Sequence, residues 1–394
     1  MPTYKRPTRK NPLRFNIIRG NKSKRKIALK LRSAVILAGV LILAIIFMFI
    51  NSLAPGGVIE WAQNTFIFAR TDDGWGETSL GDSARILQTS NNNSMVLTDT
   101  ALIGFNSAGN LLFNRLHGFT NPEMITNSTR TLIFDRDGRG VRVHNLRSEL
   151  HFDRMDNAII TGDLSANGTV ALATRSTQRS VMSEIHIYNH NWRDVNVINT
   201  YDYILTDIAI SDNGRMVYGL FLSAHEGEIV SIVKSFNVRN GQMAERIDFN
   251  GIFLFNINIM GNRIAALGED RVVSLRRNLS YLRSYEFGGG QMTKFDIGDS
   301  AIAVVLEDSE QSLIKVISRN ARLVTEHEIY GEVLRVTRVS GAVIALRHQE
   351  ILRIRDSGRT ESGAAPADTI DVGMARRQVL ALSGNRLRVV EVER

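Results

Sequence analysis

The sequence predicts an all-β fold, an eight-bladed β-propeller, preceded by a single transmembrane α-helix. Three observations lead to this prediction. An apolar run near the N-terminus is long enough to cross a bilayer, the chain beyond it alternates short β-rich segments with turns, and these segments recur at a nearly constant spacing. The chain has 394 residues, which is enough for one large domain or two of ordinary size.

The apolar run defines the first three segments of the chain. Residues 34–50 are 17 consecutive apolar residues, and with their neighbours they form a predicted transmembrane helix over residues 33–54. Two alternatives are a buried core helix and a cleaved signal peptide. A core helix rarely runs this far without a polar face, and Pro55 disfavours cleavage because it follows the small residues directly. A basic tail, residues 1–32, precedes the helix, and a linker, residues 55–64, follows it.

Charge orients this segment as a signal-anchor. Residues 1–32 contain 12 Lys or Arg and no acidic residue, whereas residues 55–64 carry only Glu60. The positive-inside rule therefore predicts a single-pass protein of the cell membrane with a cytoplasmic N-terminus and an extracytoplasmic C-terminal domain. We expect the lipid bilayer to hold residues 33–54 and anionic lipid head groups to contact the basic tail.

The rest of the composition narrows the possible functions. The chain has no cysteine, which excludes disulfides, thiolate metal sites and cysteine nucleophiles. The net charge of +8 belongs to the tail, because the remaining residues include 36 basic and 40 acidic side chains. The main domain therefore lacks the basic footprint of a nucleic-acid-binding protein, and we expect no nucleic-acid partner.

A repeat of about 40 residues fills residues 65–394, the predicted extracytoplasmic propeller. Each unit has a turn, an apolar strand, a second turn and a second strand. The corresponding positions lie near residues 94, 130, 168, 214, 262, 300, 342 and 378. In the fourth unit we expect four strands, with a hairpin loop over residues 223–228 between the middle two. A four-stranded propeller blade needs about this length.

Ring closure follows from one spare strand. The eighth unit ends with the chain and leaves no room for an outermost strand, whereas Thr65–Arg70 belongs to no unit, so we expect Thr65–Arg70 to complete the last blade. Seven blades are the alternative count. A β-sandwich or two smaller β domains are the alternative folds.

These turn-strand units resemble the quinoprotein-like and WD40-like propeller superfamily over residues 60–394. No unit carries a Trp-Asp pair or the tryptophan-docking pattern of quinone enzymes. The whole layout, a basic tail, one helix and a cysteine-free propeller, is similar to a family of Gram-positive membrane proteins known as domain of unknown function 5711. This resemblance implies a membrane-tethered extracytoplasmic propeller and implies no reaction.

The sequence contains no persuasive catalytic, cofactor or metal motif. Asp135–Gly138 resembles the start of a calcium loop but lacks the later acidic ligands, so a polar turn is the preferred interpretation. His186 and His190 lie four residues apart, a spacing that separates them by about 13 Å on a strand. We therefore predict no catalytic residue, no cofactor and no metal site.

One loop is a candidate ligand-binding site. The stretch from Thr71 to Glu77 combines an aromatic with three acids, Asp72, Asp73 and Glu77, around Trp75. Such a loop can bind a sugar or a cation, or it can cap a blade.

These observations favour a non-enzymatic function. The first hypothesis is a membrane-tethered propeller that acts as a binding or scaffolding module for an envelope protein or a cell-wall polymer. The alternatives are a propeller enzyme, either a glycan hydrolase or a quinone-dependent oxidoreductase, and an envelope sensor.

Overall fold

The computed structural model describes residues 35–45, 75–90, 93–308 and 311–393 of the chain. Residues 35–45 form a helix. No helix in the described part of the chain combines the length and the apolar character needed to cross a membrane. The helix covers most of the first half of the predicted span 33–54, and the other residues of that span, the basic tail and the linker lie outside the described residues.

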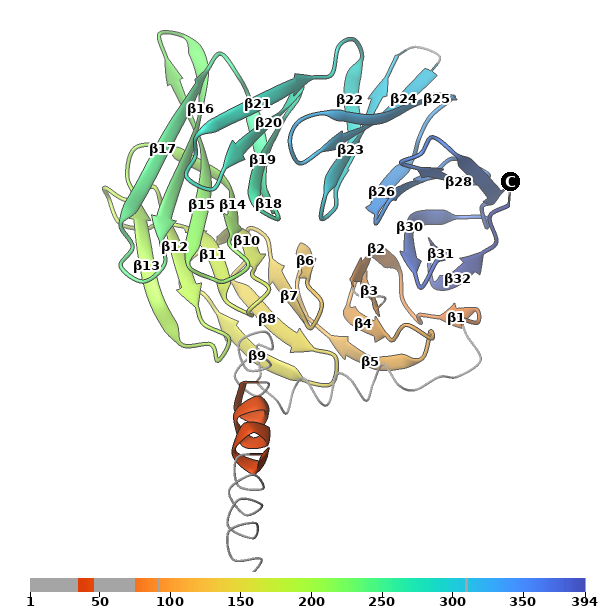
Figure 1. The fold of residues 1–394 in the computed structure, drawn as a ribbon, viewed down its shortest axis with the longest axis horizontal. Helices are drawn as coiled ribbons and strands as arrows, with labels where there is room; N and C mark the ends of the chain where they lie inside the picture. The colour runs from red at the N-terminus through yellow and green to blue at the C-terminus, as the bar shows by residue number, and fades with distance from the viewer. Residues whose placement is uncertain (1–34, 46–74, 91–92, 309–310, 394) are drawn as a thin grey trace, which may run out of the picture. The chain divides into compact units, whose positions relative to one another are not determined.

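Thirty-two β-strands make up the rest of the described structure, and they form eight four-stranded sheets (Figure 1). Blades 1 and 2 contain β2 (Ala84–Ser90), β3 (Asn93–Thr98), β4 (Ala101–Phe105), β5 (Leu111–Leu116), β6 (Pro122–Thr126), β7 (Arg130–Asp135), β8 (Gly140–Asn145) and β9 (Glu149–Arg154). Blades 3 and 4 contain β10 (Ile159–Leu164), β11 (Val170–Arg175), β12 (Ser183–Tyr188), β13 (Asp194–Thr200), β14 (Ile204–Ile210), β15 (Met216–His225), β16 (Glu228–Asn237) and β17 (Met243–Asn250).

The second half of the chain repeats this order. Blades 5 and 6 contain β18 (Leu254–Met260), β19 (Arg263–Gly268), β20 (Arg271–Arg276), β21 (Tyr281–Glu286), β22 (Gln291–Ile297), β23 (Ala301–Glu307), β24 (Gln311–Ser318) and β25 (Leu323–Tyr330). Blades 7 and 8 contain β26 (Arg335–Val339), β27 (Ala342–Leu346), β28 (Glu350–Arg355), β29 (Thr360–Ala364), β30 (Thr369–Ala375), β31 (Gln378–Ser383), β32 (Arg386–Val390) and, from the other end of the propeller sequence, β1 (Thr78–Ser79).

The fold confirms the prediction of eight blades. Each predicted repeat position lies within two residues of the start of a blade's second strand, because the turn that the pattern detected is the one between the first and second strands. In Figure 1 the first strand of every blade lies nearest the centre and the fourth lies at the periphery.

Ring closure differs from the prediction in one respect. The last blade does receive its outermost strand from the N-terminal part of the chain, but that strand is β1, in which Thr78 pairs with Leu387 and Ser79 with Arg386. The segment predicted for this role, Thr65–Arg70, lies outside the described residues. The prediction chose the more apolar segment, whereas the fold uses the two residues that reach the edge of β32 immediately before the turn into β2.

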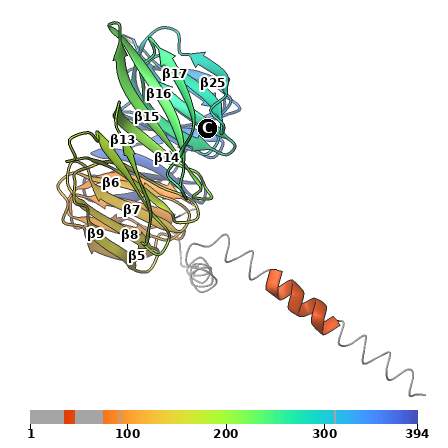
Figure 2. The ribbon, with the colours of Figure 1, turned by 90° about the vertical axis from the view of Figure 1, so that its left-hand side faces the viewer.

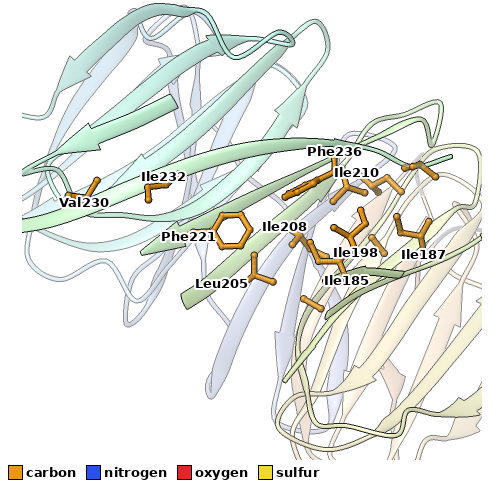
Figure 3. Packing of buried hydrophobic residues seen from close by; sticks show 14 residues of the cluster. Ile185, Ile187, Ile198, Leu205, Ile208, Ile210, Phe221, Val230, Ile232 and Phe236 are labelled. Carbon is orange, nitrogen blue, oxygen red and sulfur yellow. The ribbon is translucent and has the colours of Figure 1, made fainter. Parts of the chain in front are cut away.

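The core is divided among the seams between blades. Each of the eight seams contains one cluster of buried apolar side chains, because successive residues of a strand point to opposite faces of its sheet. In β15, Val217 and Phe221 pack toward blade 3, whereas Tyr218 and Leu220 pack toward blade 5. Figure 3 shows the seam between blades 3 and 4, where Ile208 of blade 4 lies beside side chains of blade 3. Middle strands are therefore apolar on both faces.

The strand directions divide the loops between two faces. Neighbouring strands of each blade are antiparallel. We call the upper face the one that carries the loops between second and third strands and the connections from one blade to the next. The lower face carries the loops between first and second strands and between third and fourth strands.

Candidate functional site

The first strands of the blades carry a repeated carboxylate contact. At four seams, an aspartate on the first strand of one blade accepts a hydrogen bond from a backbone N–H on the first strand of the next blade. The donor–acceptor pairs are Ile210 N to Asp163 Oδ2 at 2.7 Å, Ile257 N to Asp207 Oδ2 at 2.9 Å, Arg338 N to Asp296 Oδ2 at 2.5 Å and Leu87 N to Asp371 Oδ2 at 2.8 Å. We call these four contacts the aspartate bridges.

Burial changes the acidity of these carboxyl groups. Removal from water disfavours the charged form and raises the pKa of Asp163 to about 6, of Asp207 to about 7 and of Asp296 to about 6, and it raises the pKa of Asp371. The backbone N–H donors oppose this shift without cancelling it. Asp207 accepts three hydrogen bonds within the described structure: from the backbone N–H of Ile257, the backbone N–H of Ile208 and the hydroxyl of Thr161. The bridges therefore fasten neighbouring blades.

Other seams are joined by different groups. Gln88 Nε2 donates to Met124 O at 2.9 Å between blades 1 and 2, and Thr337 Oγ1 donates to Val372 O at 2.8 Å between blades 7 and 8. Between blades 5 and 6, the rings of Phe255 and Phe295 lie 5.6 Å apart on the two first strands. Aromatic packing thus joins the first strands at that seam, while Arg263 Nε to Asn320 Oδ1 and Ser274 Oγ to Arg319 O are hydrogen bonds between the same two blades.

Blade 4 extends beyond its neighbour on the upper face. Strands β15 and β16 have ten residues each, whereas the corresponding strands of blade 5, β19 and β20, have six each (Figure 2). Ile204 pairs with Leu222, and Ala224 pairs with Ile229, so these four residues share the face of the sheet that turns toward blade 5. Ile204 is 60% exposed and Ile229 is 50% exposed. We call Ile204, Leu222, Ala224 and Ile229 the overhang.

Acidic side chains lie in the hairpin of the overhang and in an upper loop of the next blade, where Asp270 is paired with Arg271 at 2.7 Å. Glu226 and Glu228 occupy the tip of its hairpin, and Glu269 and Asp270 form the neighbouring upper loop of blade 5. That loop lies against the connection from blade 4 to blade 5, since a Cβ on Gly268 would lie 2.5 Å from Phe253 O. All four carboxylates are exposed. The arrangement suits a ligand that offers apolar and basic groups together.

The two faces of the propeller carry opposite charge. Among the described residues, the connecting loops of the upper face contain eleven acidic residues and four basic ones. The acidic residues are Asp82, Asp99, Asp137, Asp156, Asp202, Glu226, Glu269, Asp270, Asp308, Glu332 and Asp368, and the basic ones are Arg136, Arg139, Arg179 and Arg347.

The lower face shows the reverse. Its described connecting loops contain ten arginines and three acidic residues. The arginines are Arg147, Arg193, Arg215, Arg239, Arg277, Arg319, Arg322, Arg359, Arg376 and Arg377, and the acidic residues are Asp212, Asp299 and Asp356. All of these arginines except Arg277, which is half-buried, are exposed. The described residues after β32 add Glu391 and Glu393.

The predicted ligand-binding loop is only partly described. Asp72 and Asp73 lie outside the described residues. The Trp75 ring lies 5.7 Å from the Phe105 ring and packs into the cluster between blades 8 and 1. Glu77 accepts hydrogen bonds from Arg386 at 2.6 Å and Arg388 at 3.0 Å. These are contacts of a loop that caps a blade; a ligand for this loop stays a prediction.

The other candidate residues also contact protein. Asp135 Oδ1 accepts hydrogen bonds from Thr120 N at 3.1 Å and Asn121 N at 2.7 Å, which is the behaviour of a polar turn. His186 lies 3.1 Å from Glu184 on the same strand. The described residues contain no group of three or more His, Cys, Asp or Glu side chains arranged to hold a metal.

Sequence reasoning missed the aspartate bridges, the overhang and the charge difference between the faces. The bridges join residues 42 to 284 positions apart, so no local pattern reveals them. The charge difference did leave a signal, because acidic residues and arginines gather in alternate turns along the chain.

Solved structures with this architecture share little sequence with the chain. BamB from Moraxella catarrhalis has a TM-score of 0.53 and 9% identity over 81% of this chain and 99% of its own. Sqt1 from Saccharomyces cerevisiae has a TM-score of 0.52 and 11% identity over 82% and 98%. Raptor from Chaetomium thermophilum has a TM-score of 0.50 and 11% identity over 84% and 30%. At these identities the likeness shows the fold alone.

Sequence comparison assigns the chain more narrowly. Among curated proteins, none shows significant sequence similarity to it. The model of the DUF5711 family matches residues 76–383, which is nearly the whole propeller and more than half of the chain. The chain therefore belongs to the DUF5711 family, a family of unknown function whose fold here is an eight-bladed β-propeller.

Proposed function

We propose that this protein is a non-enzymatic binding module, tethered to the cell membrane, that recruits a partner protein through the overhang of blade 4. The observation that carries the proposal is the apolar sheet face formed by Ile204, Leu222, Ala224 and Ile229, which no neighbouring blade covers at Ile204 and Ile229. Two exposed isoleucines on one sheet face lose their contact with water when a partner binds, at a gain of about 25 cal/mol per Å² of apolar surface.

Charge defines the kind of partner. Glu226 and Glu228 lie in the hairpin of the overhang and Glu269 in the upper loop of the next blade, so a segment with apolar side chains flanked by Lys or Arg would pair with both features. Fully exposed rim charges contribute mainly to the rate and orientation of association, whereas the buried apolar contacts supply most of the affinity. We therefore expect binding to weaken with salt without being abolished.

The membrane part of the proposal rests on the sequence. The 17 apolar residues at 34–50 and the excess of basic residues before them support a single-pass anchor with its N-terminus in the cytoplasm. An anchor of this kind confines the propeller to one surface and raises its effective concentration for neighbours there. Resistance of the full chain to alkaline carbonate extraction tests the anchor. Release into the soluble fraction would refute it.

Site-specific photo-cross-linking tests the overhang. A photoreactive amino acid at Ala224 in the full chain, irradiated in intact cells, should yield an adduct with a second protein species. The double variant Ile204→Asp/Ile229→Asp should reduce that adduct by at least about tenfold, as expected for hot-spot residues. The matched control is Leu116→Asp/Leu323→Asp, which adds the same charge at exposed apolar positions on the outer strands of blades 1 and 6.

Three outcomes would count against this role. They are an adduct that persists in the overhang variant, an adduct lost equally in the control, and an adduct formed only with a second copy of the chain.

A further inference from the structure

The lower face of the propeller is both its basic face and the face at which the described N-terminal part of the propeller begins. Trp75 lies against the lower loop of blade 1, since a Cβ on Gly109 would lie 2.9 Å from the Trp75 ring and backbone. From there the chain runs through β1 toward the upper face. The segment that leads back to the apolar run at 34–50 therefore joins the propeller at its arginine-rich face.

The arginines of blades 4, 5 and 6 form a continuous group on that face. Val238 N donates to Arg215 O at 2.9 Å, which holds the two lower loops of blade 4 together and places Arg239, the residue after Val238, near Arg215. In blade 5, Arg277 donates to Gly261 O. A Cβ on Gly261 would lie 2.7 Å from Arg319 of blade 6, so that loop also touches the next blade.

Most of this charge is not neutralised within the protein. Among the described residues, Arg277 has Asp212 within 3.3 Å, whereas the side chains of Arg215, Arg239, Arg319 and Arg322 have neither an ion pair nor a hydrogen bond. Guanidinium groups bind phosphate oxygens in a planar, bidentate geometry and stay charged at all physiological pH values. These four unpaired arginines lie on one face of the propeller, and together they can bind an extended surface of phosphate groups.

We propose that the lower face docks on anionic phospholipid head groups of the membrane to which the chain is tethered, so that the acidic upper face and its overhang point away from the bilayer. This inference rests on the proposed tether and goes beyond it, because a tether alone does not define which face of the propeller turns toward the bilayer. Each arginine held near an anionic bilayer strengthens docking by about fivefold at low ionic strength. The acidic upper face is repelled by the same lipids, which reinforces the orientation.

Energy transfer in lipid nanodiscs tests this orientation with the full chain. Because the chain has no cysteine, a donor dye can be attached at one introduced cysteine, either Asn240→Cys in a lower loop or Ser180→Cys in an upper loop. The acceptor is a head-group-labelled lipid. In discs that contain phosphatidylglycerol, transfer from position 240 should exceed transfer from position 180. The difference should vanish in phosphatidylcholine discs and near 1 M salt, where the screening length falls to about 3 Å.

Matched variants identify the arginines responsible. The variant Arg215→Gln/Arg239→Gln/Arg319→Gln/Arg322→Gln should lower the equilibrium constant for docking by nearly three orders of magnitude, because it removes four lipid-facing charges at about fivefold each. The control Arg139→Gln/Arg154→Gln/Arg179→Gln/Arg283→Gln removes the same charge from exposed positions on the upper loops and outer strands, and it should keep the difference between the two labels. None of these side chains has an ion pair among the described residues, so both variants should fold.

Each contrary result has its own meaning. A chain that does not insert into discs refutes the tether, and with it this inference. An inserted chain whose two labels report equal transfer in phosphatidylglycerol discs overturns the docking and leaves the tether intact. A soluble poly(glycerol phosphate) that binds through the same four arginines, while phosphatidylglycerol has no effect on transfer, overturns the lipid assignment in favour of an anionic polymer.

Discussion

Two neighbouring seams of the ring are closed by different chemistry. Between blades 4 and 5, Asp207 accepts a hydrogen bond from Ile257 N, whereas between blades 5 and 6 the rings of Phe255 and Phe295 meet. The β-bulges in the first strands of blades 4 and 5 show which residues occupy equivalent positions at the two seams. Asp207 is the first residue after a bulge in β14, and Asn256 occupies the same position after the bulge in β18. Equivalent first strands of the ring are thus joined by a carboxylate at one seam and by aromatic rings at the next.

This difference implies that the stability of a seam depends on pH only where a titratable carboxyl group closes it. Burial raises the pKa of Asp207 to about 7, so its charge changes close to neutral pH. The Phe255–Phe295 contact carries no titratable group. Four predictions test this contrast, and all are measured as the free energy of unfolding of the full chain in detergent.

The largest effect is expected for Asp207→Ala at pH 5. The substitution leaves the buried Ile257 N and Ile208 N without their acceptor, which costs roughly 3 kcal/mol for the two donors together. Chemical denaturation monitored by tryptophan fluorescence measures the loss. A loss below about 1 kcal/mol would mean that the bridge contributes little to that seam.

The next effect is the pH dependence of that loss. A carboxyl whose pKa is higher in the folded protein than in the unfolded chain stabilises the fold below its folded pKa, and this contribution disappears as the pH rises through that value. The cost of Asp207→Ala should therefore shrink by about 2 kcal/mol between pH 5 and pH 8. Each pH requires the difference in the free energy of unfolding between the original chain and the variant. Other groups also titrate: burial lowers the pKa of His144 to about 3, which makes the fold more stable as the pH rises, opposite to the effect of Asp207.

A smaller and pH-independent effect is expected for Phe255→Ala. The ring is half-buried and contacts both Phe253 and Phe295, so its removal should cost about 1.5 kcal/mol. The same loss at pH 5 and at pH 8 would sharpen the contrast between the seams. A loss that depends on pH as strongly as that of Asp207→Ala would remove it.

The smallest effect is expected for Asn256→Asp, which places a carboxyl at the bridge position of the aromatic seam. The buried Asn256 Oδ1 has no hydrogen-bond partner in the described structure. A new carboxyl there should be nearly neutral at pH 5 and should destabilise the protein by about 1 kcal/mol at pH 8, because its charged form is desolvated. An unchanged stability at both values would show that water reaches this position.

Sequence reasoning recovered the fold better than it recovered the surfaces. The eight blades were predictable because every blade repeats a turn such as the one at Gly214 before an apolar strand, and each such signal is local. The overhang was not, because the predicted hairpin loop of blade 4 began at Ser223, whereas the strands continue to His225 and resume at Glu228. The part of a strand that extends beyond the neighbouring blade is rich in polar residues, so its composition is the same as that of a loop.

The closing strand was also beyond local reasoning. A two-residue strand such as β1 gives no periodic signal, and its place is fixed by pairing with β32 at the other end of the chain. The aspartate bridges have the same origin, since Asp371 and Leu87 meet only once the ring is complete. Patterns along a sequence predict the blades, and contacts between distant blades decide how they are joined.

The composite eighth blade also determines how the molecule would respond to force. A pull transmitted from the N-terminal side first meets the packed Trp75 and the ion pairs of Glu77 with Arg386 and Arg388, and then β1, the first strand it reaches. Strand β1 pairs with β32 through only two residues, so few backbone contacts oppose its detachment once these side chains have given way. The ring therefore has a weak point on the side from which it would be held, and the remaining seven blades would bear load only after β1 has detached.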